Sequence, residues 1–132
     1  LFLFVGMSLS GEEETIKLNN ELEYLKDNET NNIGQMDASK YPRYTQIATF
    51  ARLPQLCNIL PLKRKIDIGV VGVPWDNGVS YRSGARFGPN GIREASRILR
   101  PYNIGMKTYP FNTKQIVDFG DINCTPYNIN QA

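Results

Sequence analysis

The residues from Ile66 to Arg100 constrain the fold most, because they join an apolar run, a glycine-rich loop and a helical pattern. The run Ile66–Val73 is rich in β-branched residues and too short for a typical helix, which predicts a buried parallel strand that ends before Pro74. After the loop, apolar residues recur at helical spacing between Ile92 and Leu99. The order strand, loop, helix is the first half of a βαβ unit.

A second strand is predicted over Gln115–Ile122, where Ile116, Val117, Phe119 and Ile122 are apolar. Two parallel strands and one crossover helix do not close a hydrophobic core, because a parallel sheet needs further strands and helices over its faces. We therefore expect the front of a larger α/β domain, truncated after about the second strand. The segment 41–56 is predicted to be extended, or to form a single turn, across that larger body.

Residues 1–40 are predicted to form a mobile acidic arm, and residues 41–132 the N-terminal part of an incomplete domain. The first 30 residues carry seven Asp or Glu and two Lys, a net charge of −5. Leu18, Leu22 and Leu25 share one helical face, which allows a short amphipathic helix within this arm.

Little in the sequence points to export or to a membrane. No apolar run approaches the length of about 18 residues that a membrane span needs. Cys57 and Cys124 are too far apart to define a disulfide framework or a zinc site. Free thiols favour an intracellular compartment, cytoplasmic or mitochondrial. We interpret residues 1–6, which precede Met7, as a truncated upstream segment or untranslated sequence, with the tail of a targeting peptide as the alternative.

Basic residues dominate the middle of the chain, where residues 40–107 have a net charge of +9. No nucleic-acid motif with interleaved aromatic residues accompanies them, so a solvated or salt-bridged surface is predicted and no nucleic-acid partner. The glycine loop lacks both the dinucleotide fingerprint and the lysine of a P-loop. Five arginines form either an anion-binding patch or, as we favour, ion pairs with acids of neighbouring helices or subunits: Arg82, Arg86, Arg93, Arg97 and Arg100.

The candidate site residues lie in the loop that follows the first predicted strand. Ligands gather at the carboxyl ends of parallel strands, so Asp76 is either a site residue or a cap that binds backbone N–H groups of the loop. With Asn77, Ser80 and Tyr81 it forms a candidate substrate-mouth loop. Asp118 and Asp121 are predicted to serve a turn. The chain contains no histidine, so no Ser/His/Asp or Cys/His catalytic arrangement is present.

The run GVPWDNGVSYRSGARFGPNGIREAS, residues 72–96, resembles the N-terminal signature of the ureohydrolases, the arginase and agmatinase family. The segments IATFARLP (47–54) and VDFGDINCTPYN (117–128) resemble the agmatinase branch in particular. Trp75 stands where Phe or Leu is usual. The positions that match the signature are Gly72, Pro74, Asp76, Gly78, Ser80, Arg82, Gly84, Arg86, Gly88, Pro89, Ile92 and Arg93.

This resemblance implies a partial arginase-like three-layer α/β/α fold. It also implies two manganese ions (Mn2+) in the full-length protein, bridged by a hydroxide that attacks the guanidinium carbon of the substrate. Family members place the metal ligands in Gly-Gly-Asp-His, Asp-Ala-His-x-Asp and Asp-x-Asp-x-x-Asp motifs, none of which occurs in this sequence. We therefore expect no catalytic and no metal-binding residue within it.

The implied activity of the full-length protein is hydrolysis of agmatine to urea and putrescine, a step of polyamine biosynthesis. Hydrolysis of another linear guanidino compound, guanidinobutyrate or guanidinopropionate, is the close alternative. We predict that the 132-residue chain is itself inactive. A non-catalytic short product that binds full-length subunits is the alternative from a different class, because members of the family usually form homo-oligomers.

Overall fold

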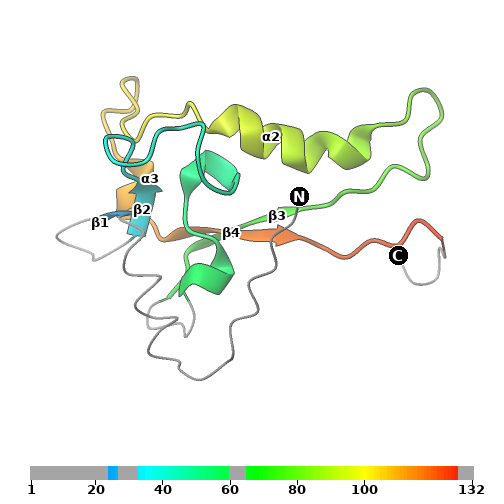
Figure 1. Ribbon diagram of the computed structural model, residues 1–132, viewed down its shortest axis with the longest axis horizontal. Helices are drawn as coiled ribbons and strands as arrows, with labels where there is room; N and C mark the ends of the chain where they lie inside the picture. Colours follow the sequence, from blue (N-terminus) through cyan, green and yellow to red (C-terminus); the bar gives the residue numbers. More distant parts are fainter. Residues whose placement is uncertain (1–23, 27–32, 60–64, 128–132) are drawn as a thin grey trace.

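The computed structural model describes residues 24–26, 33–59 and 65–127, which form two small sheets and short helices (Figure 1). Strands β1 (Tyr24–Lys26) and β2 (Ile33–Met36) are antiparallel, whereas β3 (Ile68–Gly72) and β4 (Ile116–Asp121) are parallel. The helices and turns are η1 (Phe50–Arg52), η2 (Leu56–Ile59), η3 (Ala85–Phe87), α2 (Gly88–Ser96) and α3 (Pro110–Thr113). Within these residues, no helix has the length and apolar character that crossing a membrane requires.

The predicted strand, loop and helix are confirmed as a βαβ unit. Strand β3 lies within the apolar run and β4 within the second predicted strand. Helix α2 has Pro89 in its first turn, where the missing N–H leaves no hydrogen bond unmade, and it ends at Ser96, before Pro101. Figure 1 shows α2 running back alongside the sheet, as the crossover of a parallel pair requires.

The core of the described chain lies between the sheet and the segment 50–54. Ala51, Leu53 and Ile116 are buried together, with Phe50 and Val70 partly buried against them. The Asp118 N–H donates to the Pro54 carbonyl at 3.0 Å, and Gln55 forms a parallel bridge with Asp118. The segment predicted to cross a larger body therefore covers the outer edge of β4.

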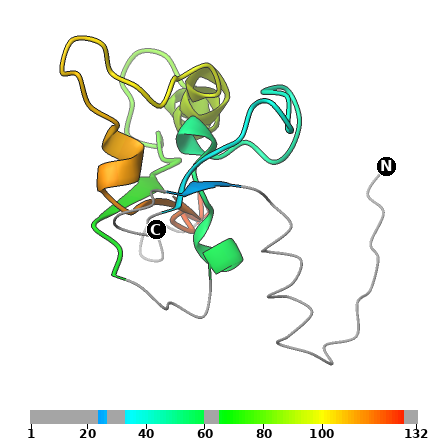
Figure 2. The same cartoon turned by 90° about the vertical axis from the view of Figure 1, so that its left-hand side faces the viewer.

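Strand β2 belongs to this body, although the sequence placed it in the mobile arm. The buried Gln115 side chain binds both backbone groups of Ile33, accepting from its N–H at 2.8 Å and donating to its carbonyl at 3.1 Å. Buried Gln35 donates to the carbonyls of Ala51 and Leu99 at 2.9 and 3.2 Å. The acidic arm was predicted from the distribution of charged residues, which gives no information about contacts made by uncharged glutamines. Figure 2 shows β2 beside α3 and the segment 50–54.

The predicted short helix in the arm is not seen where it can be checked, because Leu25 lies in strand β1. Leu18 and Leu22 lie outside the described residues, as does most of the predicted arm. For residues 1–23 and 27–32, the predicted mobile arm therefore stays a prediction.

Helix α2 buries polar residues rather than the apolar residues that its spacing suggested. Arg93 and Ser96 are its buried side chains, whereas Ile92 is 60% exposed. Val71 on β3 and Val73, which directly follows the strand, are also exposed, and with Ile92 they line an open apolar groove between helix and strand. Among the described residues this groove stays open to solvent, and the predicted lack of covering layers stays a prediction.

Candidate functional site

The carboxyl ends of β3 and β4 lie side by side, and the segments that leave them stay together. The Ile122 N–H donates to the Gly72 carbonyl at 3.0 Å, and the Asn77 amide donates to the Pro126 carbonyl at 3.2 Å. Ligands of α/β proteins bind at such strand ends. We call the loop 73–87, which leads from β3 to α2, the rim loop.

Asp76 binds the rim loop from inside. Its buried carboxylate accepts hydrogen bonds from the Gly84 N–H at 2.6 Å and from the Arg86 guanidinium at 2.5 Å. Gly84 has a φ of +123°, which a residue with a side chain would adopt only under strain. These are the contacts of a loop cap, the second of the two roles that the sequence left open for Asp76.

Of the other predicted rim residues, only Asn77 contacts this cap. Asn77 joins it through its side-chain oxygen, which accepts from Arg86 Nη2 at 3.1 Å. Ser80 and Tyr81 are exposed, and the Arg82 guanidinium lies 5.0 Å from the centre of the Tyr81 ring. The structure thus brings Asp76 and Asn77 together and leaves Ser80 and Tyr81 facing solvent.

The Asp76 cap makes the rim loop sensitive to acid. The hydrogen bond from Arg86, followed by that from the Gly84 N–H, lowers the pKa of Asp76 to about 2. An unfolded Asp has a pKa of about 3.9, so this stabilisation is complete above about pH 4 and is lost as the pH falls through 2. In the full-length protein, the difference in unfolding free energy between wild type and Asp76→Asn should shrink between about pH 4 and pH 2. Urea unfolding at several pH values measures it, and a difference that stays constant would refute the cap.

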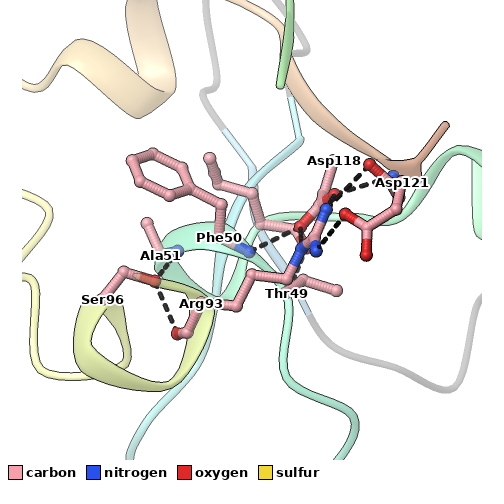
Figure 3. Close-up of polar contacts among 9 residues, drawn as sticks. Thr49, Phe50, Ala51, Arg93, Ser96, Asp118 and Asp121 are labelled. Atoms are coloured by element: carbon pink, nitrogen blue, oxygen red, sulfur yellow. Dashed lines mark hydrogen bonds and ion pairs between the residues drawn. The ribbon is translucent and has the colours of Figure 1, made fainter. Parts of the chain in front are cut away.

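A second and larger polar cluster lies beside the strand ends and is centred on Arg93 (Figure 3). Its guanidinium donates to both carboxylate oxygens of Asp118, at 2.8 and 3.0 Å, and to the carboxylate of Asp121 at 2.6 Å. It also donates to the Gly120 carbonyl at 2.8 Å. We call Arg93, Asp118 and Asp121 the arginine clamp. It joins helix α2 to the end of strand β4.

A β-bulge in β4 makes the clamp possible. Residues three apart in a regular strand point to opposite faces of the sheet. Asp118 pairs with Val70 and Gly120 pairs with Val71, so Phe119 is an extra residue in the ladder. Asp121 then pairs with Gly72, two steps from Val70, and lies on the same face as Asp118. Gly120, with a φ of +78°, permits this bend.

The clamp also holds the segment before the sheet. The Phe50 N–H donates to Asp118 at 2.7 Å, and the Ala51 N–H donates to the Ser96 hydroxyl at 2.7 Å (Figure 3). Ala51 and Arg52 both have positive φ, of 52° and 56°. Such strain costs about 1–3 kcal/mol per residue and persists only where neighbouring contacts impose it. Asp118 and Ser96 supply those contacts from β4 and α2.

Hydrogen bonds outweigh burial in setting the pKa values of Asp118 and Arg93. Burial alone would raise the pKa of Asp118, but hydrogen bonds from Arg93 and from the Phe50 and Gly120 N–H groups outweigh it and lower that pKa. The same Asp118 hydrogen bond, ahead of the opposing effect of burial, raises the pKa of Arg93. Both groups therefore stay ionised at neutral pH. A buried pair stabilises only when its remaining buried polar atoms are also bonded, and no buried side-chain atom of the clamp lacks a partner.

The arginine clamp was not predicted from the sequence. Asp118 and Asp121 were expected to serve a turn, and Arg93 was one of five arginines left between an anion patch and ion pairs. The structure pairs three of those arginines within the chain: Arg86 with Asp76, Arg93 with the clamp carboxylates, and Arg97 with Glu94. The available signal was the D-x-G-D spacing, because a glycine between two carboxylates permits the bulge that aligns them.

The described residues do not fit a metal centre. Nowhere in this part of the chain do three His, Cys, Asp or Glu side chains gather around a common point. The two carboxylates of the clamp, Asp118 and Asp121, are both paired with Arg93. A metal would have to displace that guanidinium.

Comparison with known proteins agrees with this architecture. The model of the arginase family matches residues 66–132. The chain belongs to the arginase family. Proclavaminate amidinohydrolase of Streptomyces clavuligerus is 44% identical over 98 residues, 74% of this chain and 30% of that protein. Putative agmatinase 1 of Schizosaccharomyces pombe is 49% identical over 89 residues, which cover 64% of this chain and 23% of that protein. Guanidinobutyrase of Pseudomonas aeruginosa is 39% identical over 97 residues, 74% and 30% of the two chains.

The fold comparison confirms the predicted class. The structure of the S. clavuligerus proclavaminate amidinohydrolase superposes with a TM-score of 0.58 at 46% identity, over 67% of this chain and 29% of that one. This arginase-family chain therefore has a partial α/β fold with parallel strands. The chain spans less than a third of the length of each of these three relatives.

Proposed function

We propose that the full-length protein is a hydrolase that removes the guanidino group of a small linear substrate as urea. Water adds to the guanidinium carbon, the bond from that carbon to the alkyl-bearing nitrogen breaks, and this nitrogen leaves as an amine. The observation that carries the proposal is the identity of 39–49% to proteins named amidinohydrolase, agmatinase and guanidinobutyrase. Because these names share an amidino or guanidino group, they support a common reaction more firmly than one substrate.

Agmatine is our first candidate substrate, with putrescine as the amine product. The relative with the highest of the three identities is named a putative agmatinase, and the segment 47–54 resembles that branch. Guanidinobutyrate and guanidinopropionate follow, since relatives named for both are 39% and 34% identical. The two manganese ions implied by the family would take their ligands from outside the described residues, so no step is assigned to residues here.

We further propose that the rim loop lines the mouth of this active site, with Asn77, Ser80 and Tyr81 toward the substrate. The support is the position of the loop at the carboxyl end of β3. Asp76 would then shape the loop from inside. The full-length protein would act as a homo-oligomer, as the family resemblance implies.

Urea release tests the function directly. The full-length protein, supplied with manganese, should release urea from agmatine faster than from either guanidino acid, and a chelator should abolish the reaction. Tyr81→Ala should raise KM with little change in melting temperature, because that side chain is 85% exposed. A full-length protein that releases no urea from all three compounds would refute the proposal.

The 132-residue chain alone should release no urea above a protein-free blank. It has no histidine, and its described residues gather no metal ligands. Chelator-sensitive urea formation by this chain would place the site within it and contradict our assignment.

A further inference from the structure

The contact between Arg93 and Asp121 joins the two ends of the rim loop. The loop begins after Gly72, whose ladder partner is the clamp residue Asp121, and it ends at helix α2, which carries Arg93. Arg93 and Asp121 are joined at 2.6 Å. The clamp therefore keeps the two ends of the loop together, and the ion pair between Asp76 and Arg86 stabilises the loop between them.

The segment after β4 depends on the same contacts. Asp121 is the last residue of the strand, and Ile122 is held to the Gly72 carbonyl beyond it. A bulge leaves this end of β4 with an irregular ladder, so regular sheet pairing does not by itself set the direction in which the chain leaves. Arg93 fixes the bulge through the carboxylate of Asp118 and the carbonyl of Gly120.

We propose that Arg93 is a positioning residue for the active site: through Asp118 and Asp121 it sets the paths of the rim loop and of residues 122–127. This inference rests on the proposed function, because it assigns these two segments to the site of guanidino hydrolysis. Arg93 acts through its neighbours rather than on the substrate, since its guanidinium is already bonded to Asp118, Asp121 and Gly120.

The clamp requires an arginine. Its three nitrogens donate in different directions within one plane, two of them to Asp118 and one to Asp121. A lysine keeps the positive charge but donates from a single point, so it cannot reproduce the paired bonds to one carboxylate. Arg93→Lys therefore removes the geometry and keeps the charge.

The test uses the full-length protein and compares Arg93→Lys with Arg97→Lys. Arg97 lies one turn further along and donates to the carbonyls of Arg43, Thr45 and Gln46, away from the strand ends. Each variant is measured for melting temperature, kcat, KM and amide hydrogen exchange. Arg93→Lys should lower kcat by roughly 10- to 100-fold in folded protein, the loss expected when reacting groups are misplaced by about 1 Å. It should also speed exchange in the rim loop and in 122–127.

Arg97→Lys should lower the melting temperature by about as much as Arg93→Lys does. It should leave kcat unchanged, and also the rate of amide exchange at the strand ends. If Arg93→Lys does not fold, Asp121→Asn takes its place, because this carboxylate is partly exposed and the change preserves its shape. Unchanged exchange in both segments, or equal effects from the Arg97 variant, would overturn the proposal. Exchange is measured without substrate, so it still decides the inference if the wild-type protein proves inactive on guanidino compounds.

Discussion

Expressed alone, the 132-residue chain is expected to be partly ordered and prone to aggregate, without a cooperative melting transition. Among the described residues, the buried apolar core consists of Met36, Ala51, Leu53, Ile116 and Val117. Ordering each residue costs on the order of 1–2 kcal/mol in backbone entropy, whereas apolar burial contributes about 25 cal/mol per Å². A core of this size falls short of that entropy cost.

Exposed apolar residues should increase the tendency of the isolated chain to aggregate. Val73 is 56% exposed and Val71 49%, and both lie at or just beyond the end of β3. Within the described chain, β3 pairs on one side only, so its free edge can pair with another copy. Calorimetry and size-exclusion chromatography measure the result. Val71→Lys should slow aggregation, whereas Thr125→Lys, beyond the sheet, should not. A soluble monomer with a sharp melting transition would contradict this prediction.

Gly72→Ala in the full-length protein should destabilise the fold by about 1–3 kcal/mol, the usual cost of an overpacked site. A Cβ at this position would overlap the Asp121 carboxylate and lie 2.8 Å from the Cβ of Pro89. Asp121 cannot turn aside without leaving Arg93, and Pro89 belongs to the first turn of α2. Relief of either clash therefore disturbs the clamp or the helix.

Gly91→Ala is the matched control. It lies in α2 with nothing within 4 Å of the added Cβ, so it should be neutral or stabilise by up to about 1 kcal/mol through helix propensity. Chemical denaturation of both variants gives the comparison. Equal stability of Gly72→Ala and wild type would mean that the strand ends lie further apart than the structure places them.

Local patterns were enough to predict the elements that frame the site. Both parallel strands, the glycine loop and α2 follow from runs of apolar residues and from the positions of Pro74 and Pro89, because strand and helix periods are properties of neighbouring residues. The loop-capping role of Asp76 was also among the roles predicted, since an Asp can bind backbone N–H groups of its own loop. The family was indicated by the resemblance of residues 72–96 to the ureohydrolase signature.

Only the tertiary structure decided what happens between elements. The face of α2 that is buried carries Arg93 and Ser96, because the partners of these side chains come from β4 and from residues 50–51. The bulge at Phe119 turned two aspartates with an expected turn role into one binding site for Arg93. Gln35 and Gln115 joined β2 to the body through long-range backbone contacts. Each of these pairings joins residues 16 to 82 positions apart, a separation at which local periodicity carries no information.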